Sequence, residues 1–197
     1  MPRRHPIKVL VVDDTPGRAS ALAGALAVVK GVEVACTLET PMELPARVAE
    51  HKPDVVLIAT DSPSRDVLEQ LAVVNAAAPR PVVMFTEDAA DESIRAAIGA
   101  GVSAYIVDGL SPGRLGTILR VAIERFGAEQ RLRAELEDTK LKLADRKVIE
   151  RAKGILMKGR GMSEDEAFAA LRQHAMARGL KLGEAARQLI DIASLLG

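Results

Sequence analysis

The sequence is poor in aromatic residues and in cysteine. It contains no tryptophan, one tyrosine and three phenylalanines, which make up 2% of 197 residues. This scarcity argues against a protein that binds single strands by stacking successive bases on aromatic platforms. Any nucleic acid contact therefore has to rest on charge and shape. The one cysteine, Cys36, excludes an intramolecular disulfide, and its apolar neighbours predict a buried structural thiol in a reducing compartment.

Long hydrophobic runs and an excess of one charge are also missing. The apolar run at residues 9–12 stops at two aspartates and is too short for a signal peptide or a membrane span. We therefore expect a cytoplasmic protein without membrane contact. The 27 basic and 27 acidic residues cancel, but residues 145–197 hold 10 basic and 7 acidic residues. The C-terminal part is thus mildly basic.

Up to about residue 125, five short apolar runs alternate with helical patterns. Continuous apolarity predicts parallel strands that are buried on both faces, at residues 7–12, 32–37, 54–59, 81–85 and 104–107. Three helices are expected to begin with a capping hydroxyl followed by proline, at Thr15, Thr40 and Ser111. Right-handed crossovers then give a doubly wound α/β domain of the flavodoxin-like kind, with a five-stranded parallel sheet and any site beyond the carboxyl ends of its strands.

A helical stem is predicted to follow this domain. Its apolar residues recur at alternating four- and three-residue steps, which is coiled-coil spacing. They form two stretches, Leu115, Leu119, Ala122 and Phe126, then Leu132, Leu136, Thr139 and Leu143. The stretches are out of phase, so we expect a kink or stutter near residues 127–129. The spacing favours a dimer through the stem; the alternative is an amphipathic helix that covers its own domain.

The last segment predicts a small helical unit. The stem continues through Leu156 and breaks at residues 159–161. Ser163 and Glu166 form a capping box for a second helix that ends at Gly179. The apolar stripe of this helix is expected to be Phe168, Leu171 and Ala175, and a third helix should bury Leu182, Ala186, Leu189 and Ile190. About fifty residues make a marginal bundle, so the unit is expected to lean on the stem or on a second copy.

Two adjacent carboxylates, Asp13 and Asp14, follow the first strand, where they suit a hard cation such as Mg²⁺. The segment VLVVDD at residues 9–14 resembles the start of response-regulator receiver domains. The resemblance implies a phosphoacceptor aspartate after the third strand, a threonine or serine after the fourth, a lysine after the fifth and an aromatic switch residue. Thr86 and Tyr105 match two of these positions.

Two departures from the receiver pattern predict that phosphotransfer is lost. Ala59 stands at the acceptor position, where its methyl group can neither accept phosphate nor bind magnesium, and Asp108 replaces the lysine that would clamp the phosphoryl oxygens. Residues 1–126 are therefore expected to be a pseudo-receiver that serves as a docking surface, with no catalytic residue, metal or cofactor. A weak Mg²⁺ site at Asp13 and Asp14, and Asp61 as a substitute acceptor, are the alternatives.

Residues 127–197 are expected to be the stem continuing into an RNA-binding unit. The segments VIERAKGILM at 148–157 and SEDEAF at 163–168, followed by Leu171 and Arg172, resemble the ANTAR domain. The resemblance implies binding to leader-mRNA hairpins, which prevents transcription termination. The cations that could engage phosphates are Lys147, Arg151, Lys153, Lys158, Arg160, Arg172, Arg178 and Lys181. Gly154 inside a helix fits close approach by another backbone, or close helix packing.

The loop ATDSPSRD at residues 59–66, the turn at residues 107–110 and the ANTAR-like unit together resemble the NasT-type antiterminators of nitrate assimilation. That resemblance implies control by a NasS-like nitrate or nitrite sensor protein rather than by phosphorylation. The coiled-coil spacing of the stem predicts a homodimer at least when RNA is bound. A phosphorylation-dependent two-component response regulator with RNA or DNA output is the alternative. His5, His51 and His174 lack metal-ligand spacing and are expected at the surface.

Overall fold

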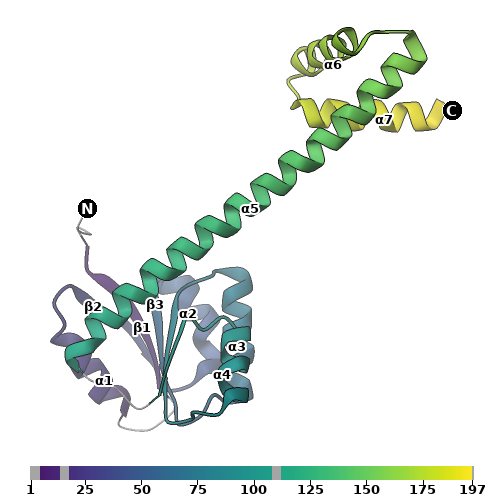
Figure 1. Cartoon of the computed structure of the whole chain (residues 1–197). Helices are drawn as coiled ribbons and strands as arrows, with labels where there is room; N and C mark the ends of the chain where they lie inside the picture. The colour runs from purple at the N-terminus through teal and green to yellow at the C-terminus, as the bar shows by residue number, and fades with distance from the viewer. Residues whose placement is uncertain (1–4, 14–17, 108–111, 197) are drawn as a thin grey trace. The chain divides into compact units, whose positions relative to one another are not determined.

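The computed structural model describes residues 5–13, 18–107 and 112–196, and it divides into two compact units, Met1–Gln130 and Arg131–Gly197 (Figure 1). In the first unit strands and helices alternate along the chain. They are β1 (Ile7–Asp13), α1 (Arg18–Ala27), β2 (Val32–Leu38), the 3-10 helix η1 (Pro41–Glu43), α2 (Leu44–His51), β3 (Val55–Ala59), α3 (Arg65–Ala77), β4 (Val82–Thr86), α4 (Asp91–Gly99) and β5 (Ala104–Val107).

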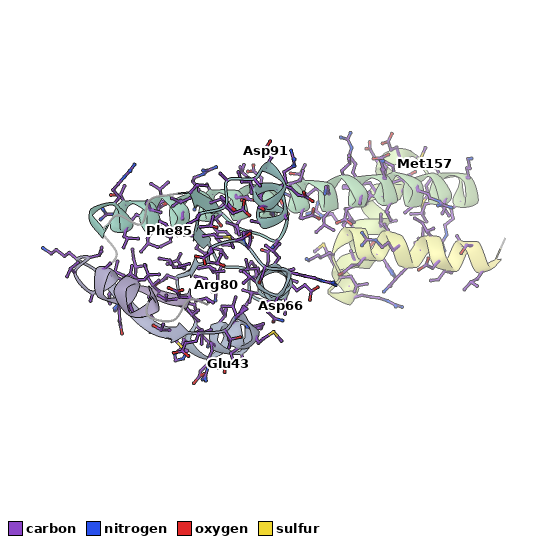
Figure 2. All side chains as sticks on the ribbon, turned by 90° about the horizontal axis from the view of Figure 1, so that it is seen from below. Glu43, Asp66, Arg80, Phe85, Asp91 and Met157 are labelled. Carbon is purple, nitrogen blue, oxygen red and sulfur yellow. The ribbon has the colours of Figure 1, made fainter. Side chains whose placement is uncertain are left out.

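The five strands form one parallel sheet in the order β2-β1-β3-β4-β5. Every residue of β3 and β4 is buried, which is why these strands are apolar without alternation. Helix α1 and the start of the long helix α5 (Pro112–Arg160) cover one face, where Phe85 lies, and α2, α3 and α4 cover the other (Figures 1 and 2). The predicted doubly wound fold and its five strands are confirmed. Burial on both faces was expected for every strand and is wrong for β2 and β5, which are largely half-buried because they are the edge strands.

Two of the three predicted proline-flanked helix starts, at Thr15 and Ser111, lie outside the described residues. At the third, the Thr40 hydroxyl accepts a hydrogen bond from the Met42 backbone N–H at 3.4 Å and caps η1, directly before α2. Cys36 is only partly buried, so the expected buried thiol is wrong. Its side chain packs against the apolar core on the sheet face that α2, α3 and α4 cover, and it stays partly exposed because β2 is an edge strand.

Helix α5 continues through residues 127–129 without a helix end, and the kink or stutter expected there stays a prediction. A change of apolar phase alters which face is hydrophobic, but it breaks no backbone hydrogen bond, and the helix also includes Gly127, a poor helix former. The first stretch packs in the core of its own unit through Leu115 and Leu119, as the amphipathic alternative predicted. The leucines of the second stretch are more than half exposed.

The C-terminal unit consists of the end of α5, then α6 (Glu164–Arg178) and α7 (Leu182–Leu196). The predicted capping box is present, because the Ser163 hydroxyl accepts from the Glu166 N–H and the Glu166 carboxylate accepts from the Ser163 N–H. Gly179 ends α6 with a φ of 65°. None of the described helices is long and apolar enough to span a bilayer.

The core of this unit joins Ala152 and Leu156 of α5, Leu171 and Ala175 of α6, and alanines of α7. The inward face predicted for the third helix is confirmed, since Ala186 is buried and Leu182, Leu189 and Ile190 pack against the core. One prediction for α6 is wrong. Ala167 occupies the core position, and Phe168 remains 41% exposed.

Candidate functional sites

The first candidate site lies at the carboxyl ends of β1 and β3. Asp13, the last residue of β1, is paired in register with Ala59, the last residue of β3, and the two residues are 1% and 2% exposed. The alanine methyl group therefore occupies the buried position beside Asp13 where a receiver would present its acceptor carboxylate. Asp14 and Asp108 lie outside the described residues.

The described residues contain only part of the candidate Mg²⁺ site, because Asp13 is described and Asp14 is not. A magnesium ion takes its protein ligands from one or two carboxylates and keeps several waters, and the position beside Asp13 adds a methyl group instead of a second carboxylate. Among the residues that the structure describes, no three His, Cys, Asp or Glu side chains gather to hold a metal ion.

The hydroxyl of Thr86, the expected switch residue, is engaged in the loop after β3. Its Oγ1 donates to the carbonyl oxygen of Asp61 at 2.8 Å, and the Glu87 N–H donates to the same oxygen at 3.3 Å. The Thr60 N–H in turn donates to the Phe85 carbonyl at 3.0 Å. These bonds fix the exit of β4 to the loop after β3. Asp61, the alternative acceptor, lies in that loop and is exposed.

Asp88 is the centre of this region, and sequence reasoning missed it. Its carboxylate accepts from the hydroxyls of Ser62 at 2.6 Å and Ser93 at 2.7 Å and from the Ala90 N–H at 2.8 Å. These bonds, above all the one from Ser62, lower the pKa of Asp88. Its carbonyl accepts from the Tyr105 hydroxyl at 2.8 Å. The two predicted switch positions are thus joined through Asp88, because its N–H also donates to Oγ1 of the β4 threonine at 3.2 Å.

The second candidate site is the set of cations in the C-terminal unit. Seven of the eight predicted side chains are exposed, and they come from the end of α5, from α6 and its exit, and from the residue before α7. They are Lys147, Arg151, Lys158, Arg160, Arg172, Arg178 and Lys181. Exposed cations of this kind can neutralise phosphates, so the placement is compatible with a polyanionic ligand.

Lys153 does not belong with these exposed cations, which corrects the prediction for this residue. It is 7% exposed, and its Nζ atom lies 2.6 Å from the Glu164 carboxylate and 2.9 Å from that of Glu150. The two carboxylates raise the pKa of Lys153, and Lys153 lowers the pKa of Glu164. Its ammonium group therefore ties α5 to the first turn of α6. The available signal was the glutamate three residues earlier on the same helix.

The glycines of this unit also differ from expectation. A Cβ atom on Gly154 would meet nothing within 4 Å, so close helix packing does not explain this residue. The tight position is Gly183, where a Cβ atom would lie 2.5 Å from the Asp145 carboxylate. That carboxylate forms an ion pair with Arg187, which joins α7 to α5. The histidines 5 and 174 are exposed as predicted, and His51 is half-buried.

Each of the two units matches a known protein family. The response regulator receiver domain model matches residues 9–120, and the ANTAR domain model matches residues 137–190. The transcriptional regulatory protein PdtaR of Mycobacterium tuberculosis is 30% identical over 141 residues, which cover 72% of this chain and 69% of that protein. The nitrate regulatory protein of Klebsiella oxytoca is 41% identical over 66 residues, which cover 34% of this chain and 17% of that protein.

Solved structures match the first unit. The response regulator domain of Thermotoga maritima CheB has a TM-score of 0.51 at 22% identity and covers 61% of this chain and 96% of its own. A CheY-like receiver domain protein from Methanospirillum hungatei has a TM-score of 0.54 at 22% identity and covers 63% and 98%. At this identity the likeness establishes the fold alone.

Proposed function

Because this chain belongs to the family of response regulators that join a receiver domain to a C-terminal ANTAR domain, we propose that it is an RNA-binding antiterminator and not an enzyme. In this proposal the C-terminal unit binds hairpins of a nascent leader mRNA in the cytoplasm and thereby excludes a terminator stem. The observation that carries it is that seven of the eight predicted cations in the ANTAR-matched unit are exposed.

We also propose that a partner protein controls this regulator by docking on the receiver domain, and that phosphorylation does not. Two observations support it. Ala59 leaves no acceptor oxygen at the buried end of β3, and the Thr86 hydroxyl already donates to a carbonyl of the neighbouring loop. A sensor protein that binds nitrate or nitrite is the proposed partner, in line with the similarity to a nitrate regulatory protein of Klebsiella oxytoca. Transfer of radiolabel from a phosphodonor to the intact chain would overturn this part.

A homodimer through the stem is also proposed. Leu132, Leu136 and Leu143 are more than half exposed at coiled-coil spacing within α5. In a parallel two-stranded seam with Leu136 at an a position, Glu135 of one chain and Lys140 of the other occupy facing g and e positions, where opposite charges attract. A dimer would present two RNA-binding units together. Once one of two linked hairpins is bound, the second hairpin would therefore meet its unit at a high effective concentration.

The proposal is tested with the full chain, a synthetic two-hairpin RNA and a single-hairpin control. Affinity is measured over a series of salt concentrations, and light scattering gives the mass of the free and bound protein. We expect the two-hairpin RNA to bind more tightly, to a dimer, with an affinity that falls steeply as salt rises. Equal binding of both RNAs would refute the dimeric arrangement. Absence of hairpin binding, with and without a nitrate-sensor partner, would refute the antiterminator.

A further inference from the structure

Phe168 is an exposed aromatic side chain in a chain that has only four aromatic residues. It is 41% exposed and takes no part in the apolar core of its unit, where Ala167 packs instead. Met176, two turns further along the same helix, is 73% exposed. Single exposed apolar side chains are normal on a protein surface, whereas apolar side chains that lie together mark a binding surface.

These side chains form a groove along α6. Phe168, Arg172 and Met176 follow one another at four-residue steps, so they share one helix face. With Ala169, Gln173 and Ala177 they line a shallow groove of about 530 Å³. The lining combines a flat ring, a flexible thioether, one guanidinium and one amide, and none of its six residues is acidic.

The charge of the groove favours an anionic occupant over a second copy of the chain. Arg172 lies midway between the two apolar side chains, so a two-fold symmetric contact centred on this face would bring two guanidinium groups together. A nucleotide satisfies all the lining groups at once. Its base offers a π face to an aromatic ring, its phosphate offers oxygens to arginine, and its base edge offers hydrogen-bonding groups to an amide.

We propose that this groove holds one unpaired base of the RNA hairpin loop, stacked on Phe168, with Arg172 on an adjacent phosphate. This inference rests on the proposed function and specifies which part of the RNA the α6 face contacts. In this arrangement the exposed cations elsewhere in the unit contact the phosphates of the paired hairpin stem. The scarcity of aromatic residues excludes a platform for successive bases, but a single base needs only a single ring.

The experiment uses the full chain and a two-hairpin RNA in which loop adenines are replaced one at a time by 2-aminopurine, a base whose fluorescence falls on stacking. The variants are Phe168→Leu, Phe168→Tyr and Arg172→Gln. Met157→Ala is the matched control, because Met157, which lies on α5 (Figure 2), has a similar exposure, 38%, and does not line the groove. Thermal unfolding of each variant is followed in parallel to confirm that the fold is retained.

We expect binding by the wild type to quench 2-aminopurine at one loop position. Phe168→Leu should abolish that quenching and weaken binding about tenfold, the usual size of one base–aromatic stack. Phe168→Tyr should retain both properties, and Met157→Ala should change neither. Arg172→Gln should weaken binding and reduce its salt dependence by about one phosphate contact.

Three results would overturn the inference, and they separate it from the proposed function. If the wild type binds the RNA and Phe168→Leu leaves affinity and quenching unchanged, the groove does not hold a base and the antiterminator stands. If the same variant instead changes the mass of the free chain in light scattering, the groove is an interface between copies. If the wild type binds no hairpin RNA, the inference and the proposed function both fail.

Discussion

Placing an aspartate at residue 59 tests how the first unit is controlled. The new carboxylate would end β3 in a position 2% exposed, paired across the sheet with Asp13, which is 1% exposed. Neighbouring strands are about 4.8 Å apart. Two like charges about 5 Å apart at an effective dielectric constant of about 20 repel by about 3 kcal/mol. Ala59→Asp should therefore destabilise this unit by up to that amount at neutral pH.

The matched control is Ala59→Asn, which adds a side chain of the same size without the charge. Thermal unfolding of the full chain is measured for both variants with and without millimolar Mg²⁺. We expect Ala59→Asp to unfold several degrees below Ala59→Asn in the absence of the ion. Mg²⁺ should reduce this difference in melting temperature, because Ala59→Asp places a second carboxylate beside Asp13 and a divalent cation offsets the repulsion between the two.

Hairpin binding by Ala59→Asp should remain within about twofold of the wild type, because the C-terminal cations are unchanged and the fifth-strand lysine is still replaced by Asp108. Equal melting temperatures for the two variants would refute the buried like-charge pair. A large gain in RNA affinity on treatment with a phosphodonor would refute control by docking alone.

Three further changes separate structural from ligand-binding roles. Lys153→Gln should lower the melting temperature without altering the salt dependence of RNA binding, because two carboxylates already hold the ammonium group. Arg160→Gln should reduce the slope of log affinity against log salt by about 1 and leave stability unchanged. Equal slopes for the two variants would contradict these separate roles. Hydrogen bonds lower the pKa of Asp88, so the ionised carboxylate stabilises the fold above an ordinary carboxyl pKa of about 4, and this stabilisation is lost as pH falls through the lowered value. In urea unfolding from pH 7 to 3, Asp88→Asn should therefore lose less stability than the wild type. Parallel stability curves for the two proteins would contradict this role of Asp88. Gly154→Ala should raise helix stability by about 1 kcal/mol in chemical denaturation, and a simultaneous loss of RNA affinity would show that RNA backbone approaches this residue.

The α/β fold is predictable because burial on both faces leaves a strong pattern. Every residue of β3 and of β4 is buried, and both appear in the sequence as unbroken apolar runs between turn signals. The N-terminal cap of α6 is equally predictable from the sequence, because Ser163 and Glu166 have the spacing of a capping box and both of its hydrogen bonds form. In each case a local pattern has one physical interpretation.

The candidate sites were harder to predict because their partners are distant in sequence. Lys153 looks like any surface cation until α6 brings Glu164 within 2.6 Å of it. Asp88 gains its role from Ser62 and Ser93, which reach it from other loops and helices. A charge count recognises the cations, but only the fold decides which of them are neutralised within the chain.

The exposed position of Phe168 shows why hydrophobicity alone misassigns a helix stripe. Phe168, Leu171 and Ala175 are spaced as a helical face, and so are Ala167, Leu171 and Ala175. The bulkier residue is the natural choice from sequence, yet close packing of short helices favours the smaller one, and the core contains four alanines from α6 and α7. The phenylalanine is then turned about 100° from the core side. A scarce residue type can therefore still supply a functional contact, since composition limits how many such contacts exist and the fold determines where they lie.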